Sequence, residues 1–122
     1  MLLEQEFSLT AQDSGINAAY RKYSAPEVMI YREGMFPRFS LKSGLDLIKN
    51  RENGNWTWRP SGGGISNSGD FGYTYGISEE SSGPAASGNI DISSYLHIWR
   101  NFSEEGWQLV LDITNPVPDL PE

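Results

Sequence analysis

The sequence contains no cysteine and only one histidine among its 122 residues. The absence of cysteine excludes disulfide bonds, thiolate metal ligands and thiol nucleophiles together. A transition-metal site usually draws on imidazole and thiolate ligands, and a single imidazole leaves too few of them. We therefore expect neither a metal nor a cofactor.

Basic residues are scarce as well, because nine Lys and Arg stand against 16 Asp and Glu, for a net charge of −7. They are scattered singly apart from the adjacent Arg21 and Lys22. A protein that follows a phosphate backbone needs a basic patch, so nucleic acid is not an expected partner. The three glycines at 62–64 are not followed by the Lys-Ser/Thr of a phosphate-binding loop.

Long apolar runs are also missing. Glu4 and Glu6 interrupt the region where a signal peptide needs an unbroken apolar stretch, and no later segment reaches the length of a membrane span. We expect no membrane partner and a cytoplasmic location, or a periplasmic or secreted one if a leader has been removed.

What the chain does have is aromatic residues, with 4 Trp, 6 Tyr and 5 Phe. Large aromatic side chains bury much surface each, and this length suits one core, so residues 1–122 are expected to form a single domain. The spacing of apolar residues predicts one long helix from about Glu4 to Ser24, interrupted only by Gly15. A short strand over 27–32 and a second helix over 44–52, with Ser43 as its N-cap, are predicted next.

After Gly54 the chain has strand character to near its end, with a glycine loop at 61–65 and a long polar loop at 78–89. Helices followed by a run of strands predict an α+β domain, in which the helices pack on one face of a curved antiparallel sheet. Such a sheet forms a cone whose open end suits a pocket. The predicted strands cover 55–60, 64–68, 71–78, 90–102 and 106–113.

Four segments, which together span most of the chain, resemble the ketosteroid-isomerase-like and SnoaL-like domains of the nuclear-transport-factor-2-like superfamily, a cystatin-like cone fold. They are GINAAYRKYSAPEVMIYREGMFP, NWTWRP, SGDFGYTYG and YLHIWRNFSEEGWQLVLDITNPVP. The resemblance implies a small-molecule domain, but one superfamily hosts many unrelated functions.

The resemblance also implies which residues would stand at the isomerase positions. The tyrosine that donates to the substrate oxygen corresponds to Phe7, and the aspartate that moves the proton corresponds to Tyr31. The second oxyanion donor, an aspartic acid, would fall within 95–97, where no acidic residue stands. That chemistry needs a base and aimed donors, so this chain is not expected to isomerise ketosteroids.

His97 is the first candidate for acid–base chemistry, although a structural role for this histidine is the simpler interpretation. Tyr31 and Asp112 are the two other catalytic candidates. Asp112 lies among apolar residues and must be exposed or paired. A four-residue turn at 103–106 places His97 opposite Asp112, whereas a two-residue turn at 105–106 places Trp99 there instead.

Two hypotheses for function stay open. In the first, a small apolar molecule binds in the cone, with Tyr20, Met29, Tyr31, Trp58, Tyr73 and His97 at the wall. In the second, the domain is a dimerising scaffold without chemistry. In either, the sheet face not covered by helices, with Leu96 and Ile98 on it, is expected to form a homodimer.

Overall fold

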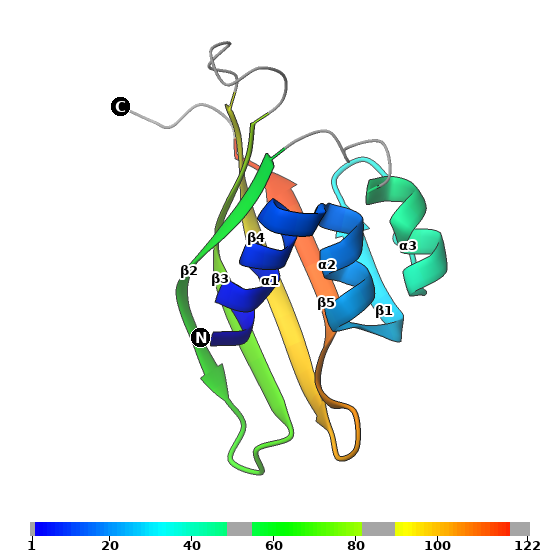
Figure 1. The fold of residues 1–122 in the computed structure, drawn as a ribbon, viewed down its shortest axis with the longest axis vertical. Coiled ribbons are helices and arrows are strands. Elements are labelled where there is room, and N and C mark those ends of the chain that lie inside the picture. Colours follow the sequence, from blue (N-terminus) through cyan, green and yellow to red (C-terminus); the bar gives the residue numbers. More distant parts are fainter. Residues whose placement is uncertain (1, 49–54, 82–89, 118–122) are drawn as a thin grey trace.

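The computed structural model describes residues 2–48, 55–81 and 90–117. Three helices lie on one face of a single curved five-stranded sheet (Figure 1), which is the α+β architecture that the sequence predicts. The strand order across the sheet is β1-β5-β4-β3-β2. The elements are α1 (Leu2–Ser14), α2 (Ile16–Tyr23), β1 (Ser24–Arg32), α3 (Leu41–Ile48), β2 (Asn55–Ile65), β3 (Phe71–Ser81), β4 (Ile90–Phe102) and β5 (Gly106–Pro116).

The long helix predicted over 4–24 is in fact two helices, α1 and α2. Gly15 separates them with φ 98° and ψ 158°, a backbone conformation that glycine adopts far more readily than other residues. The helical spacing of apolar residues continues across this break, so it could not reveal a change in direction.

The helix α3 begins earlier than predicted, at Leu41. Its cap is Ser40 rather than Ser43, because the Ser40 hydroxyl oxygen accepts a hydrogen bond from the Ser43 backbone N–H at 3.1 Å. This is the usual bond from an N-cap side chain to the third residue of the helix. The predicted last residues of this helix, 49–52, lie outside the described part of the chain.

Strands β2 to β5 form the predicted antiparallel meander, but β1 pairs with β5 in parallel. The sheet is therefore mixed, not purely antiparallel. A parallel pair needs a long crossover connection, and here the connection contains α3 and the strands β2, β3 and β4. The first strand thus pairs with the last one.

The glycine segment predicted as a loop at 61–65 belongs to β2, which runs unbroken except for a bulge between Pro60 and Gly62. The glycines are compatible with a strand because the side chains of Tyr73 and Tyr75 on β3 occupy the space that side chains at Gly64 and Gly62 would fill. A Cβ built on Gly64 would lie 3.0 Å from the Tyr73 ring. The turn follows at residues 66–70 instead, so only the first two residues of the predicted strand 64–68 are in the sheet.

The two faces of the sheet differ sharply. The face under the helices carries the core, in which Phe7 packs edge-on against Tyr20 and Trp58 with ring centroids 5.1 and 4.8 Å apart. The opposite face, called the open face below, carries exposed aromatic and aliphatic side chains. The largest of these are Met29, Tyr31, Phe71, Tyr73 and Tyr75.

We expect Gly76→Ala to destabilise the protein by more than 2 kcal/mol, an order-of-magnitude figure typical of a clash in a packed region. A Cβ at this position would lie 2.1 Å from the Arg59 carbonyl oxygen and 2.9 Å from the Pro60 Cα, both in the β2 backbone. Urea denaturation measures the change. Ser78→Ala on the same strand is the control, because the Ser78 hydroxyl is buried without a partner, and a loss of stability equal to that of Gly76→Ala would contradict the steric explanation.

Candidate functional site

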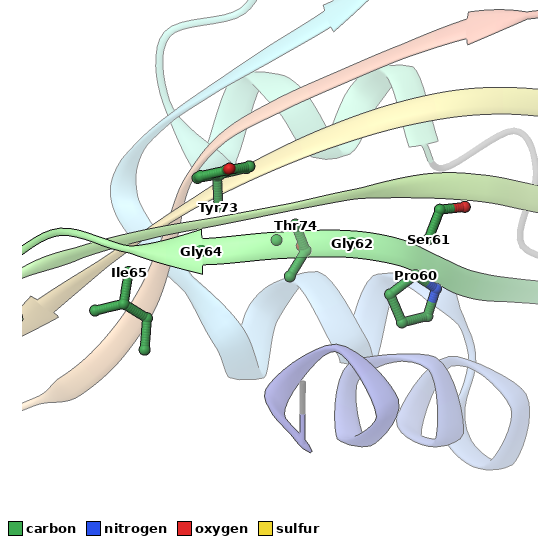
Figure 2. Close-up of a pocket in the computed structure, with 8 residues that line it drawn as sticks. Pro60, Ser61, Gly62, Gly64, Ile65, Tyr73 and Thr74 are labelled. Carbon is green, nitrogen blue, oxygen red and sulfur yellow. The ribbon is translucent and has the colours of Figure 1, made fainter.

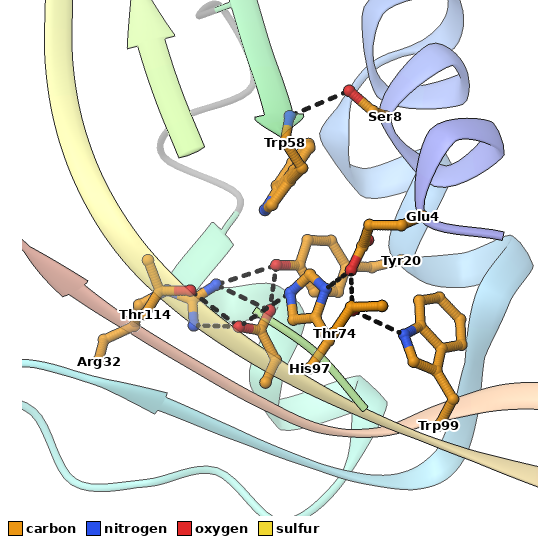
Figure 3. Close-up of polar contacts among 10 residues, drawn as sticks. Glu4, Ser8, Tyr20, Arg32, Trp58, Thr74, His97, Trp99 and Thr114 are labelled. Atoms are coloured by element: carbon orange, nitrogen blue, oxygen red, sulfur yellow. Dashed lines mark hydrogen bonds and ion pairs between the residues drawn. The ribbon is translucent and has the colours of Figure 1, made fainter. Parts of the chain in front are cut away.

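A buried carboxylate, Asp112 on β5, is the centre of a polar network under the helices. Figure 3 shows this network, with its partners Tyr20, Arg32 and His97 labelled. The Arg32 guanidinium at the end of β1 donates from its two terminal nitrogens to the two Asp112 oxygens, at 3.2 Å each. Thr114 donates to Asp112 at 2.8 Å. The Tyr20 hydroxyl from α2 also donates to Asp112. Asp112 therefore links α2, β1 and β5.

His97 on β4 extends this network to the first helix. Its Nε2 lies 3.4 Å from an Asp112 oxygen, a distance typical of an ion pair, and its Nδ1 lies 2.7 Å from the Glu4 carboxylate of α1. Thr74 of β3 donates to the same Glu4 oxygen, and the indole N–H of Trp99 donates to Thr74 at 3.4 Å. The side chains of His97 and Glu4 have no exposed surface.

Opposite charges stabilise the charged forms of His97 and Asp112 in this network. Burial would lower the pKa of His97, but the carboxylates of Glu4 and Asp112 outweigh it and raise this pKa to about 9. Burial would likewise raise the pKa of Asp112, yet Arg32 and His97 hold it well below its usual range. Burial and the Asp112 charge both raise the pKa of Tyr20, so this phenol stays a donor.

The predicted pairing of His97 with Asp112 is confirmed, although the turn that predicted it is wrong. The β4–β5 turn has three residues, between Phe102 and Gly106, rather than four or two. A bulge at Val110 then inserts one extra residue into β5 and restores the register at His97.

In the described part of the chain, this network and the aromatic core occupy the space between the helices and the sheet. Neither His97 nor Asp112 has exposed surface, and neither lines a described pocket. A general base must reach the proton that it removes. These two catalytic candidates therefore have no access to a substrate in this conformation.

A pocket of about 540 Å³ lies where β5 ends and where β2 and β4 begin, at the upper end of the sheet in Figure 1. We call it the open-end pocket. It meets the buried network at Arg32 and Thr114. Its wall is mixed, with four charged side chains among apolar ones: Arg32, Glu33, Met35, Arg38, Asp46, Leu47, Trp56, Ser93, Thr114 and Pro116.

Two other hollows lie on the described surface. One, of about 370 Å³, follows the glycine segment of the edge strand β2 (Figure 2) and has no charged side chain on its wall. The other, of about 680 Å³, lies between α2 and α3 and is lined partly by the exposed side chains of Arg21 and Lys42. Neither meets the buried network through an ionised side chain.

The six residues expected at a common pocket wall are divided between the two faces of the sheet. Tyr20, Trp58 and His97 lie in the core, whereas Met29 and Tyr31 lie on the open face with Tyr73. Alternation along β1 directs Val28 and Ile30 inward and so directs Tyr31 outward. Their exposed fractions are 38% for Met29, 36% for Tyr31 and 46% for Tyr73.

Sequence reasoning missed three residues that matter here: Glu4, Arg32 and Arg38. Glu4 precedes Phe7 by three residues and Ala11 by seven, the spacing of one helix face, and this was the available signal for its burial. No comparable pattern marks the two arginines, because the pocket joins elements that are far apart in sequence.

The described residues 2–48, 55–81 and 90–117 include no group of three or more His, Asp or Glu side chains arranged to hold a metal ion. None of the helices in these ranges combines the length and apolar character needed to cross a bilayer.

No family model matches the sequence, and no curated protein matches it. The structure, by contrast, matches solved proteins at low identity. A ketosteroid isomerase-like protein from Erwinia carotovora atroseptica matches with a TM-score of 0.72 and 14% identity, over 94% of this chain and 92% of that one. An NTF2-like protein with a cystatin-like fold from Novosphingobium aromaticivorans matches with a TM-score of 0.69 and 12% identity, over 98% and 80%. An NTF-2-like protein of unknown function from Shewanella oneidensis gives 0.72 and 12%, over 93% and 94%.

We expect the His97 ring to titrate with a pKa near 9. Between pH 6.5 and 9 the folded state then holds a proton that the unfolded state has lost, so the free energy of unfolding should fall as pH rises, by about 1.4 kcal/mol per pH unit. Urea denaturation across this range measures the slope. NMR measures the pKa directly, since the chain has one histidine.

The matched variants are Glu4→Gln and Glu6→Gln, which remove one buried and one exposed carboxylate from the same helix. Only Glu4→Gln should lower the His97 pKa. A wild-type pKa at or below 6.5, the ordinary value, would contradict the charge pairing described above.

Proposed function

Because this chain has the cystatin-like fold of the nuclear-transport-factor-2-like superfamily, we propose that it binds a small organic molecule in the open-end pocket. The observation that carries the proposal is the pocket itself. Its volume of about 540 Å³ is within the range of ligand sites, and it lies at the mouth of the cone, where it meets the buried network at Arg32 and Thr114.

The wall favours a ligand with an apolar body and a polar part. Met35, Leu47, Trp56 and Pro116 supply the apolar contacts, in keeping with the apolar ligand that the sequence suggests. Trp56 is stacked on Trp58 with ring centroids 5.8 Å apart, which holds its indole in place. A prealigned aromatic side chain loses little entropy when a flat molecule packs against it.

The proposal includes no steroid isomerisation. Phe7 has no hydroxyl and is fully buried, and Tyr31 lies on the open face. If the bound molecule is turned over in a lyase- or isomerase-like reaction, the base would be a carboxylate of the pocket wall, Glu33 or Asp46. His97 does not suit this role, because its side chain is buried and its ring is protonated at neutral pH.

Filling the pocket should abolish binding. Ser93 lies on the pocket wall at the start of β4, whereas its neighbour Ser94 is exposed on the other face of the strand. Native mass spectrometry of protein purified from its own host should reveal a bound small molecule, which Ser93→Tyr removes and Ser94→Tyr keeps. Retention of the same ligand by Ser93→Tyr would place it elsewhere and contradict the proposal.

We also propose that the open face joins two copies of the chain. Its five large aromatic and aliphatic side chains, Met29, Tyr31, Phe71, Tyr73 and Tyr75, are each 36–47% exposed, and Leu96 and Ile98 lie half-buried on the same face. All three helices cover the other face (Figure 1). Exposed apolar area on this scale usually marks an interface, and a twofold dimer covers the same patch on both copies.

Sedimentation at micromolar concentration should therefore give twice the monomer mass of 13.6 kDa. Ile98→Lys places a charge in the centre of the proposed interface and should give the monomer, because burying an unpaired charge costs several kcal/mol. Gln5→Lys, an equal change in charge at an exposed position of α1, should leave the dimer intact. A wild-type monomer would exclude this second function.

A further inference from the structure

The two arginines of the open-end pocket differ in how many of their donors are already used. Arg32 donates from one terminal nitrogen to the Tyr31 carbonyl oxygen and to Asp112, and from the other to the Tyr20 hydroxyl and to Asp112. Its four terminal N–H groups are thus committed to the fold. Arg32 closes the floor of the pocket and has little left to offer a ligand.

Arg38 has the opposite status. Its backbone is fixed against β1 by two hydrogen bonds with Ile30, of 2.8 and 2.9 Å. Its guanidinium, however, makes no hydrogen bond and no ion pair with any described residue. The Nε atom of Arg38 is buried without a partner. Arg38 is therefore a cation of the pocket wall whose backbone is fixed and whose guanidinium has no acceptor among the described residues.

A buried donor without an acceptor is unfavourable, by about 1–3 kcal/mol. The groups that satisfy a guanidinium best are planar anions, since a carboxylate accepts two parallel hydrogen bonds from its fork of donors. From this we infer that Arg38 is the recognition residue for a carboxylate group on the ligand of the open-end pocket. The inference rests on the function proposed above and adds the ligand's chemical class.

The remaining wall residues narrow that class further. Glu33 and Asp46 are also on the pocket wall, and like charges at short range are repulsive. They disfavour a second anionic group and can accept hydrogen bonds from a hydroxyl or amino group of the ligand. The apolar side chains of the same wall suit the ligand's body, so the class is a monocarboxylic acid with an apolar core.

Calorimetric titration with benzoate and with benzamide tests this, because the two probes have nearly the same shape and differ in charge at neutral pH. Benzoate should bind more tightly than benzamide by about tenfold to a hundredfold, the range expected for a hydrogen-bonded charge. Arg38→Gln should remove this preference. Arg38→Lys keeps the charge without the fork of donors and should retain only part of it.

The control is Arg59→Gln, because Arg59 is an exposed arginine of β2 that pairs with Glu79 at 3.3 Å and lies outside the pocket. It should leave benzoate affinity unchanged. The thermal midpoint of Arg38→Gln should match the wild type, since this side chain has no described partner to lose.

The inference and the proposed function fail in different ways. Equal binding of benzoate and benzamide, lost in Ser93→Tyr but kept in Arg38→Gln, would uphold a pocket ligand and overturn the role of Arg38. An absence of saturable benzoate binding up to about 10 mM, roughly tenfold above a weak dissociation constant of about 1 mM, would also overturn the role of Arg38. The proposed function would then be decided by the native mass spectra of Ser93→Tyr and Ser94→Tyr alone.

Discussion

The pairing of Asp112 with Arg32 and His97 is the interaction on which the rest of the structure depends. A carboxylate with no exposed surface is tolerated only where its charge is compensated, and here the compensating groups come from β1, β4 and α2. His97 in turn requires Glu4, which fixes the position of α1. This buried charge thus ties α1 and α2 to the sheet, and removing Arg32 or His97 would leave carboxylate charge uncompensated at a cost of about 3–5 kcal/mol.

The type and order of most elements could be predicted from sequence because alternation and helical spacing are local properties. Geometry that depends on single backbone conformations could not. The break at Gly15 leaves the helical spacing of apolar residues unchanged. The bulge at Val110 shifts the alternation by one residue, but it lies in an unbroken apolar run at 109–111 that does not show where the shift occurs. The pairing of His97 with Asp112 was predictable only because the bulge offsets the misjudged turn, and the glycine strand at 62–64 was missed because its support comes from tyrosines on β3.

The candidate site was less predictable than the fold for a related reason. Glu4 and His97 are 93 positions apart in sequence, so the local sequence around either residue does not predict their contact. The resemblance to isomerases directed attention to Tyr31 and to the interior of the cone, whereas His97 and Asp112 in that interior have no exposed surface and Tyr31 faces outward. The polar groups that line a pocket lie at the mouth of the cone instead. One of them, Arg38, lies outside the named strands and is held by an isolated backbone bridge to Ile30.

The parallel pairing of β1 with β5 has a consequence for how the chain folds as it is made. Strand β1 is complete at Arg32, yet the strand that it pairs with in the described part of the chain begins at Gly106, and the hydrogen bond between Tyr20 and Asp112 spans 92 positions. Bringing such distant segments together must be paid in chain entropy before any contact compensates it. During synthesis β1 therefore lacks its strand partner until β5 has been made, and the buried network around Asp112 can form only after that strand has left the ribosome.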